Sequence, residues 1–271
     1  MIRPREDTPR DVPVGGGCGI APPLTGPLPL PGAVTGPAAS PVPDQSRARF
    51  RGRPDGWTIE TDLRSAHGAS TSGDFVVTGA PEPGRLGILL VDVSGSGPVA
   101  GARARLLARA FAPLLDTVPG ELFLAAANGH VNRCNDDEGF ATALLVDLDL
   151  LTGRFTLFGA GHPPAVHYRS GGRRWTVLAD PEQGPALGLL ADPVFPGRAG
   201  RLDPGDALLL YTDGLVESRR MDVERGISRL VRRARSVVPR HPIGAATRIA
   251  TAMRAEDGDD RALIMIRRHP A

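Results

Sequence analysis

The sequence contains no lysine, and all 32 of its basic residues are arginine. A Walker A loop needs a lysine that reaches the phosphates of a nucleotide, so this chain has no such loop. Covalent catalysis through a lysine Schiff base is excluded for the same reason. The 30 acidic residues nearly balance the arginines, and no basic stripe with interleaved aromatic residues is present. The sequence therefore gives no case for nucleic-acid binding.

Cysteines, aromatic residues and long apolar runs are also scarce. The two cysteines, Cys18 and Cys134, are too few for a disulfide framework, which suits a reducing compartment. No uninterrupted apolar run approaches the roughly 18–20 residues that cross a membrane. The N-terminal residues lack the apolar centre of a signal peptide. We therefore expect a cytoplasmic protein without membrane association. Its core must rely on aliphatic side chains, because aromatic residues make up only 4% of the chain.

Residues 1–45 differ in composition from the rest of the chain. They hold 11 of the 27 prolines and show neither a helical nor a strand period. Such a segment cannot bury enough apolar surface to offset the entropy lost on ordering, so we predict a disordered Pro/Gly-rich tail. The tail is either a spacer or a docking and regulatory segment, and the sequence leaves both open. Residues 46–271 form the predicted globular domain.

Apolar periodicity divides this domain into strands and helices. Strands are predicted at 57–64, 73–78, 85–93, 141–149, 155–158, 166–169, 174–178, 206–211 and 261–267, and helices at 98–115, 120–132, 223–237 and 243–253. Strands joined by short turns favour antiparallel sheets, and helices in consecutive pairs argue against a doubly wound parallel sheet. The predicted fold class is α+β, with two packed, mainly antiparallel sheets flanked by helices.

Aspartates stand at the ends of four predicted strands, namely Asp74, Asp92, Asp213 and the pair Asp259-Asp260. Aspartate is a common turn residue, so each one taken singly has an ordinary structural explanation. If the four strand ends meet, however, the carboxylates repel one another strongly, and cations make the cluster tolerable. Ligation by oxygen alone selects hard ions such as Mg²⁺ or Mn²⁺. Two such ions about 4 Å apart would hold and acidify a water for attack on phosphorus.

Five segments occur in an order that resembles a known family. They are SGDFVV (72–77), VDVSGSG (91–97), FATALLVDLDLLTGRFTLFGAGHPPAV (140–166), LDPGDALLLYTDGLVESR (202–219) and DDRALIMIRR (259–268). Together they resemble the bacterial PPM-type phosphatases of the SpoIIE-like branch, over about residues 50–268. The combination of AGHPP, YTDGLVE and the final aspartate pair is specific, although each motif alone is weak. The resemblance implies an αββα four-layer sandwich, in agreement with the order of strands and helices.

The resemblance also implies an activity. Members of this family use two Mn²⁺ or Mg²⁺ ions to hydrolyse phosphoserine or phosphothreonine directly. A metal-bound hydroxide is the nucleophile and no phosphoenzyme forms. Their usual substrates are anti-anti-sigma (STAS-domain) factors, so the expected partner is a phosphorylated signalling protein. The rival hypothesis is a non-catalytic regulatory module that keeps the fold and binds a partner. The complete aspartate set favours the enzyme.

Position by position, the resemblance implies a set of metal ligands. Asp74 matches the aspartate of the family's GD motif. Asp92 matches the metal-bridging aspartate, and the backbone carbonyl of Val93 matches the ligand beside it. Asp213 matches the aspartate of the TDG motif. Asp259 matches the last metal aspartate, and Asp260 is the second choice for that position.

Other family positions are filled differently or carry supporting roles. Asp92 and Asp213 would act in catalysis through the metal-bound water. Glu217 and Asp260 are candidates to orient the metal ligands or that water by hydrogen bonds, without binding the metal themselves. Val77 replaces an acidic residue of the family motif, and Ser96 stands where a basic or polar side chain is common. No residue matches the phosphate-binding arginine of the eukaryotic relatives.

Several short features have competing explanations. The run Gly95–Ala100 fits the G-x-G-x-x-A pattern of dinucleotide-binding loops, but no βαβ alternation follows it. His162 in AGHPP is either a ligand or, as we expect, a residue that fixes a turn. The arginine pairs 219–220 and 232–233 either face an acidic partner or form a solvated surface. Because no folded sensor domain fits before residue 46, we expect constitutive activity, or control by the tail or by a separate protein. The candidate partners are such a regulatory protein or a second copy of the chain.

Overall fold

The computed structural model describes residues 55–66, 71–134, 139–218, 221–241, 243–253 and 259–270. All of them belong to one compact unit, residues 43–271. The predicted tail at 1–45, which includes Cys18, lies outside the described residues, as does the arginine pair 219–220. The disorder of the tail and the role of this arginine pair therefore stay predictions.

The described strands form two five-stranded sheets in which all neighbouring strands are antiparallel. Sheet 1 has the order β1 (Trp57–Arg64), β10 (Arg261–Arg268), β9 (Ala207–Tyr211), β6 (Val166–Arg169), β7 (Arg174–Val177). Sheet 2 has the order β2 (Asp74–Gly79), β3 (Arg85–Val93), β4 (Ala141–Asp149), β5 (Arg154–Ala160), β8 (Gly197–Arg201). The absence of parallel pairing among these strands rules out a βαβ unit after Gly95. This glycine, at φ 97°, lies in the turn that leaves β3.

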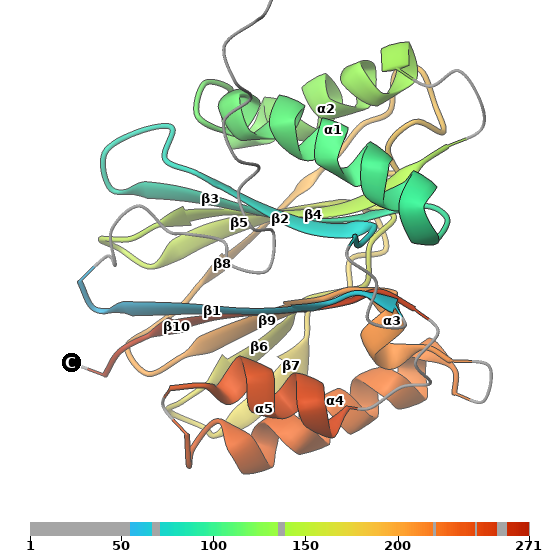
Figure 1. The fold of residues 1–271 in the computed structure, drawn as a ribbon. Helices are drawn as coiled ribbons and strands as arrows, with labels where there is room; N and C mark the ends of the chain where they lie inside the picture. Colours follow the sequence, from blue (N-terminus) through green and yellow to red (C-terminus); the bar gives the residue numbers. More distant parts are fainter. Residues whose placement is uncertain are drawn as a thin grey trace, which may run out of the picture. The chain divides into compact units, whose positions relative to one another are not determined.

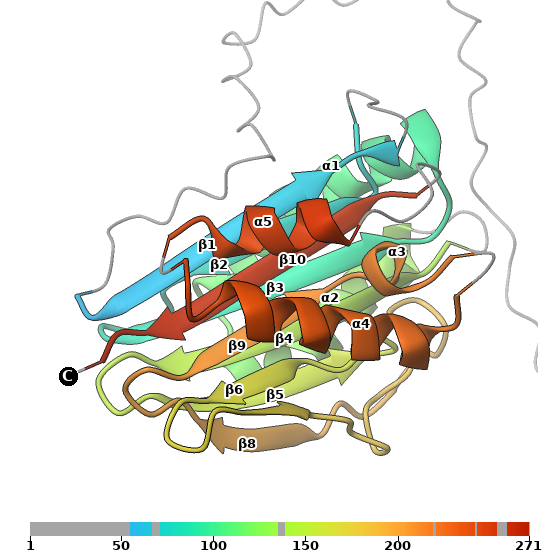
Figure 2. The same cartoon turned by 90° about the horizontal axis from the view of Figure 1, so that it is seen from below.

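The helices cover the outer faces of the two sheets (Figures 1 and 2). Helices α1 (Gly97–Leu115) and α2 (Gly120–Cys134) pack on sheet 2, and α4 (Val223–Val237) and α5 (Ala245–Ala252) pack on sheet 1. A single turn, α3 (Asp213–Val216), follows β9. The result is a helix–sheet–sheet–helix arrangement, which confirms the predicted αββα sandwich. None of the helices in the described part of the chain is both long and apolar enough to cross a membrane.

Successive side chains of a strand alternate between two environments, the helical layer outside the sheet and the space between the two sheets. In β3, Leu89 and Val91 pack towards α1 and α2, whereas Ile88 and Leu90 pack between the sheets. Successive side chains of a strand point to opposite faces. Asp92 therefore shares the face of Ile88 and Leu90 and lies on the side where the two sheets meet.

Helix α4 shows how local sequence sets a helix and its packing. Asp222 caps its N-terminus by accepting a hydrogen bond from the Arg225 backbone N–H at 2.8 Å. Its buried face packs on sheet 1 through Ile227, Leu230 and Ala234. Gly226 brings the helix against α3, because a Cβ built there would lie 1.6 Å from the Val216 carbonyl oxygen.

We predict that Gly226→Ala destabilises the protein. The added methyl group meets a backbone carbonyl, which cannot rotate away as a side chain can. The overpacking should outweigh the helix-propensity gain of about 1 kcal/mol and leave a net loss of about 2 kcal/mol. Urea unfolding measures the change. The matched control is Gly172→Ala, where a Cβ meets nothing within 4 Å, and its midpoint should stay within about 0.5 kcal/mol of the parent. Equal effects of both variants would contradict this account.

Candidate metal centre

Two aspartates face each other on neighbouring strands of sheet 2. Asp74 on β2 is the direct register partner of Asp92 on β3. Side chains directly opposite in an antiparallel pair have Cβ atoms about 4.5–5.5 Å apart, and like charges in such a pair are destabilising. The buried Asp74 therefore holds its carboxyl group directly opposite another carboxyl group.

Sheet 1 adds two further aspartates at the same edge. Asp213 follows β9 and begins α3, and Asp259 stands just before β10. The carboxyl group of Asp213 lies within hydrogen-bonding contact of Asp92. Asp259, at the exposed rim, lies near enough to Asp213 and Glu217 to feel their charges. The four strand ends that carry the predicted aspartates thus lie together.

The electrostatic consequence is a set of raised pKa values. Burial, followed by the charge of Asp213, raises the pKa of Asp92 from 3.8 to about 8. Burial, followed by the charge of Asp92, holds the pKa of Asp74 well above its ordinary value. Partial burial and Asp213 also raise the pKa of Asp259. Each shift favours the protonated, neutral carboxyl group over the charged carboxylate, and a bound cation would offset the same cost.

One oxygen of Asp74 has no hydrogen-bond partner in the described part of the chain. Its Oδ2 accepts a hydrogen bond from the Thr212 hydroxyl at 2.8 Å, but the buried Oδ1 accepts none among the described residues. Thr212 is itself fixed, because its hydroxyl accepts the backbone N–H of Ala262 at 2.9 Å. Buried polar atoms are normally satisfied, so the free Oδ1 marks a place where a ligand is expected. Sequence reasoning missed Thr212, although it lies inside the TDG motif.

Asp260 is committed to the backbone. Its two carboxylate oxygens accept the N–H groups of Ala66 at 2.7 Å and Gly73 at 2.5 Å. Its own N–H donates to Asp259 Oδ1 at 2.9 Å. Asp260 therefore ties the segments before β2 to the start of β10. Asp259, whose other oxygen accepts no bond from a described residue, is the better placed of the pair to meet an ion.

Two glycines allow the loops of the site to approach closely. A Cβ on Gly73 would lie 3.2 Å from the Val93 carbonyl oxygen, so a larger residue would crowd that carbonyl. A Cβ on Gly214 would lie 2.1 Å from the Asp260 carbonyl oxygen. Only glycine therefore fits after Asp213. These contacts explain in steric terms why the two motifs read GD and DG.

His162 lies in the loop after β5, as expected for a turn residue, and it joins the two sheets. It is buried, and its Nδ1 lies 2.8 Å from the hydroxyl of Thr142, the register partner of Asp92 on β4. Its Nε2 lies near the Tyr211 backbone without full hydrogen-bond geometry. Burial lowers the pKa of His162 to about 3. The ring is therefore neutral, and it packs between the strand ends that precede Asp213 and oppose Asp92.

Within the described residues, no three Asp, Glu, His or Cys side chains converge closely enough to form a ready ion site. The carboxylates instead form a chain of neighbours that runs from Asp74 through Asp92 and Asp213 to Asp259, with Glu217 exposed beside them. The donor set fits hard cations, because it consists of carboxylate oxygens, one of them buried and unpartnered.

Comparison with known proteins identifies relatives of this arrangement. A family model described as Stage II sporulation protein E (SpoIIE) matches residues 82–269. The phosphoserine phosphatase RsbP of Bacillus subtilis is 25% identical over 169 residues, which cover 58% of this chain and 40% of RsbP. The chain spans less than half the length of the curated relatives it matches.

Solved structures share the fold. The RsbU and RsbW domains of Rv1364c from Mycobacterium tuberculosis align with a TM-score of 0.70 and 25% identity, covering 80% of this chain and 61% of that one. The PP2C phosphatase domain of SpoIIE from Bacillus subtilis, with a fragment of its regulatory domain, aligns with a TM-score of 0.67 and 16% identity. That alignment covers 79% of this chain and 64% of the other.

The raised pKa of Asp92 predicts a pH-dependent stability of the metal-free protein. Its carboxyl group has a pKa of about 8 when folded and an ordinary value of 3.8, so the native state binds the proton more tightly. Stability from this group is present at low pH and is lost as pH rises towards about 8. Asp92→Asn should therefore raise the urea midpoint in EDTA, little at pH 4 and by the equivalent of a few kcal/mol at pH 8.

The matched control for this experiment is Asp192→Asn, an exposed aspartate, which should leave the midpoint unchanged at both pH values. Added Mn²⁺ should stabilise the parent protein and not Asp92→Asn. A variant that is less stable than the parent in EDTA at pH 8 would contradict the repulsion.

His162 should stay neutral throughout the physiological range. Because burial lowers the pKa of its imidazole to about 3, its ¹⁵N NMR signals should not shift between pH 5 and pH 8. The His162→Asn variant, which lacks these signals, supplies the assignment. A titration midpoint near the ordinary value of about 6.5 would show that the ring is solvated.

Proposed function

Because the chain belongs to the SpoIIE family, we propose that it is a metal-dependent protein phosphatase that hydrolyses phosphoserine or phosphothreonine. One observation carries the proposal. The buried Asp74 has a carboxylate oxygen without a partner and faces Asp92, whose pKa is raised to about 8. A fold gains nothing in stability from such a pair, so a role in ligand binding explains it better than a role in packing.

The proposed ligands of two Mn²⁺ or Mg²⁺ ions are Asp74, Asp92, the Val93 carbonyl, Asp213 and Asp259. When bound, the ions would neutralise the carboxylates, acidify a water and stabilise the charge that develops on the phosphoryl group. The protein's part is to hold these oxygens in place.

Neighbouring residues would position these ligands. The Thr212 hydroxyl fixes one oxygen of Asp74, and Asp260 fixes the loop that carries Gly73. The neutral His162 keeps Thr142, the register partner of Asp92, in place. Glu217, which is exposed beside Asp259, is the residue we propose to orient water at the rim.

We further propose that the substrate is a phosphorylated anti-anti-sigma (STAS-domain) factor and that the protein works in the cytoplasm. Support comes from RsbP, which is named a phosphoserine phosphatase, and from the solved structure in which an RsbU domain occurs with an RsbW domain. The cysteine content supports a reducing compartment.

We predict Mn²⁺-dependent hydrolysis of a phosphoserine peptide. EDTA should abolish the turnover. Asp213→Asn should lower kcat by about 10² or more, because it removes a charged ligand next to Asp92. The control is Asp192→Asn, which should keep full activity. Folded protein that binds Mn²⁺ without turnover would instead support a non-catalytic regulatory module. Folded protein that neither binds Mn²⁺ nor hydrolyses the peptide would remove the proposed centre altogether.

A further inference from the structure

Helix α4 presents arginines to solvent along its outer side. Among the exposed arginines of α4 and the turn after it, Arg225 pairs with Asp222 at 3.3 Å. The others form no ion pair with a carboxylate among the described residues. The exposed set on α4 and the turn after it comprises Arg225, Arg232, Arg233, Arg235 and Arg240. Most of these guanidinium groups are therefore available to a partner.

This surface concentrates the charge of the chain. Residues 223–248 contain seven arginines and one glutamate, a formal charge of +6, whereas the whole chain carries +2. The remainder is therefore net negative, at −4. A basic surface on an otherwise acidic chain indicates an anionic partner.

Stability does not explain the arrangement. Arg225 and Arg229 are four residues apart on α4, and Arg229 is three and four residues from Arg232 and Arg233. Like charges at these spacings destabilise a helix by about 0.2–0.5 kcal/mol per pair. The single glutamate, Glu224, has no arginine three or four residues further along, so the capping residue Asp222 supplies the opposite-charge pair that the described part of α4 shows, with Arg225.

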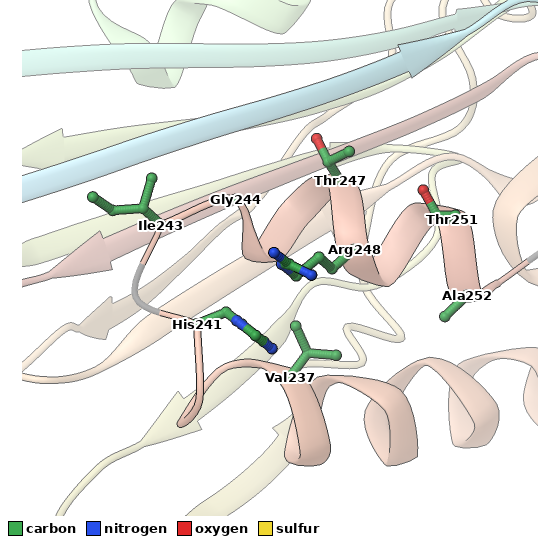
Figure 3. A pocket seen from close by; sticks show the side chains of 8 residues that line it. All are labelled: Val237, His241, Ile243, Gly244, Thr247, Arg248, Thr251 and Ala252. Carbon is green, nitrogen blue, oxygen red and sulfur yellow. The ribbon is translucent and has the colours of Figure 1, made fainter.

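A groove of about 760 Å³ lies between the C-terminal end of α4 and α5 (Figure 3), and Arg248 is the arginine in its lining. In this view the side chains of His241 and Arg248 lie between the two helices, and Ile243 projects beside them. Ile243 is 74% exposed, which is unusual for a large apolar side chain. The groove thus combines cationic and apolar chemistry.

The site is separate from the aspartate cluster. The backbone N–H groups of Gly244 and Ala246 are already satisfied by the Glu60 carboxylate, at 2.7 and 2.9 Å. A ligand would therefore meet the side chains and not the helix end. The groove lies on the helical layer outside sheet 1, whereas the aspartates lie on the inner side where the sheets meet.

We propose that the outer face of α4 and the α4–α5 groove dock an acidic segment of a partner protein that carries apolar side chains among its carboxylates. Guanidinium groups bind carboxylates in a bidentate manner, and arginine is enriched in protein interfaces. The groove would take an apolar side chain beside Ile243. This docking surface does not depend on catalysis at the aspartate cluster.

A protein segment fits better than the other anionic partners. A lipid bilayer offers no side chain to fill the groove, and the apolar residues of α4 face the sheet and cannot insert. Nucleic acid is disfavoured because neither the groove residues nor α4 include a Phe, Tyr or Trp, so His241 is the only ring there on which a base could stack.

The test is direct binding of the full chain to a fluorescein-labelled peptide of repeating Glu-Glu-Leu-Glu, measured by anisotropy at low salt. Charge reversal at three arginines (Arg232→Glu, Arg233→Glu and Arg235→Glu together) should weaken binding at least tenfold. The control reverses Arg109, Arg133 and Arg154, which are exposed elsewhere, with the same change in net charge, and should change the Kd less than twofold. Equal weakening by both variants would reduce the effect to net charge and overturn the proposal.

Further arms of the test separate the groove from the charge and the protein partner from other anions. Ile243→Ser, which removes the apolar side chain without changing the net charge, should also weaken peptide binding about tenfold, and it keeps the test valid if the triple variant unfolds. A peptide with glutamine in place of glutamate should not bind. Tighter binding to phosphatidylserine vesicles or to duplex DNA than to the peptide, lost in the α4 variant, would overturn the proposal in favour of that partner.

Discussion

The repulsion between Asp74 and Asp92 is the constraint around which the rest of the site is built. Strand pairing alone places the two carboxyl groups opposite each other, and nine residues of apolar β3 strand hold that register. The free-energy cost of burying two facing carboxyl groups is local, whereas the apolar packing that holds the two strands in register is spread over a large core. A fold can sustain such a conflict only where packing elsewhere over-determines the backbone. The two sheets and three apolar clusters supply this additional packing.

Much of the architecture could be predicted because each long element carries its own periodic signal. The limits predicted for the strands at 85–93 and 141–149 match those of β3 and β4, and the helix predicted at 223–237 matches α4. The aspartates stood out because they end strands whose apolar patterns were unambiguous. That the four ends meet was only a condition of the sequence argument. Antiparallel pairing places Asp74 opposite Asp92, and the packing of the two sheets brings Asp213 beside them. Their role in holding metal ions stays a prediction.

What the sequence could not reveal depends on distant partners. Strand β8 was missed because its sequence, GRAGR, has no apolar alternation. The space above Gly197 and Gly200 is filled by the rings of Phe158 and Phe155 on β5. The one-turn helix α3 is too short to carry a period. The link from His162 to Thr142 spans 20 residues, and the anchoring of Asp260 to Ala66 spans 194, so neither leaves a local pattern.

The pairing of β1 with β10 has a consequence for biosynthesis. Trp57 on β1 pairs with Arg268 on β10, so the strand that pairs with β1 is synthesised about 200 residues after it. Contacts of such sequence separation close only after a costly loop has been ordered. While the chain is still being synthesised, β1 and the loop held by Asp260 have nothing to pair with. Sheet 2 can assemble on α1 and α2 beforehand. Until β10 has left the ribosome, we expect Asp74 on β2 and Asp92 on β3 to be exposed to solvent, because the strands that position Asp213 and Asp259 are not yet paired.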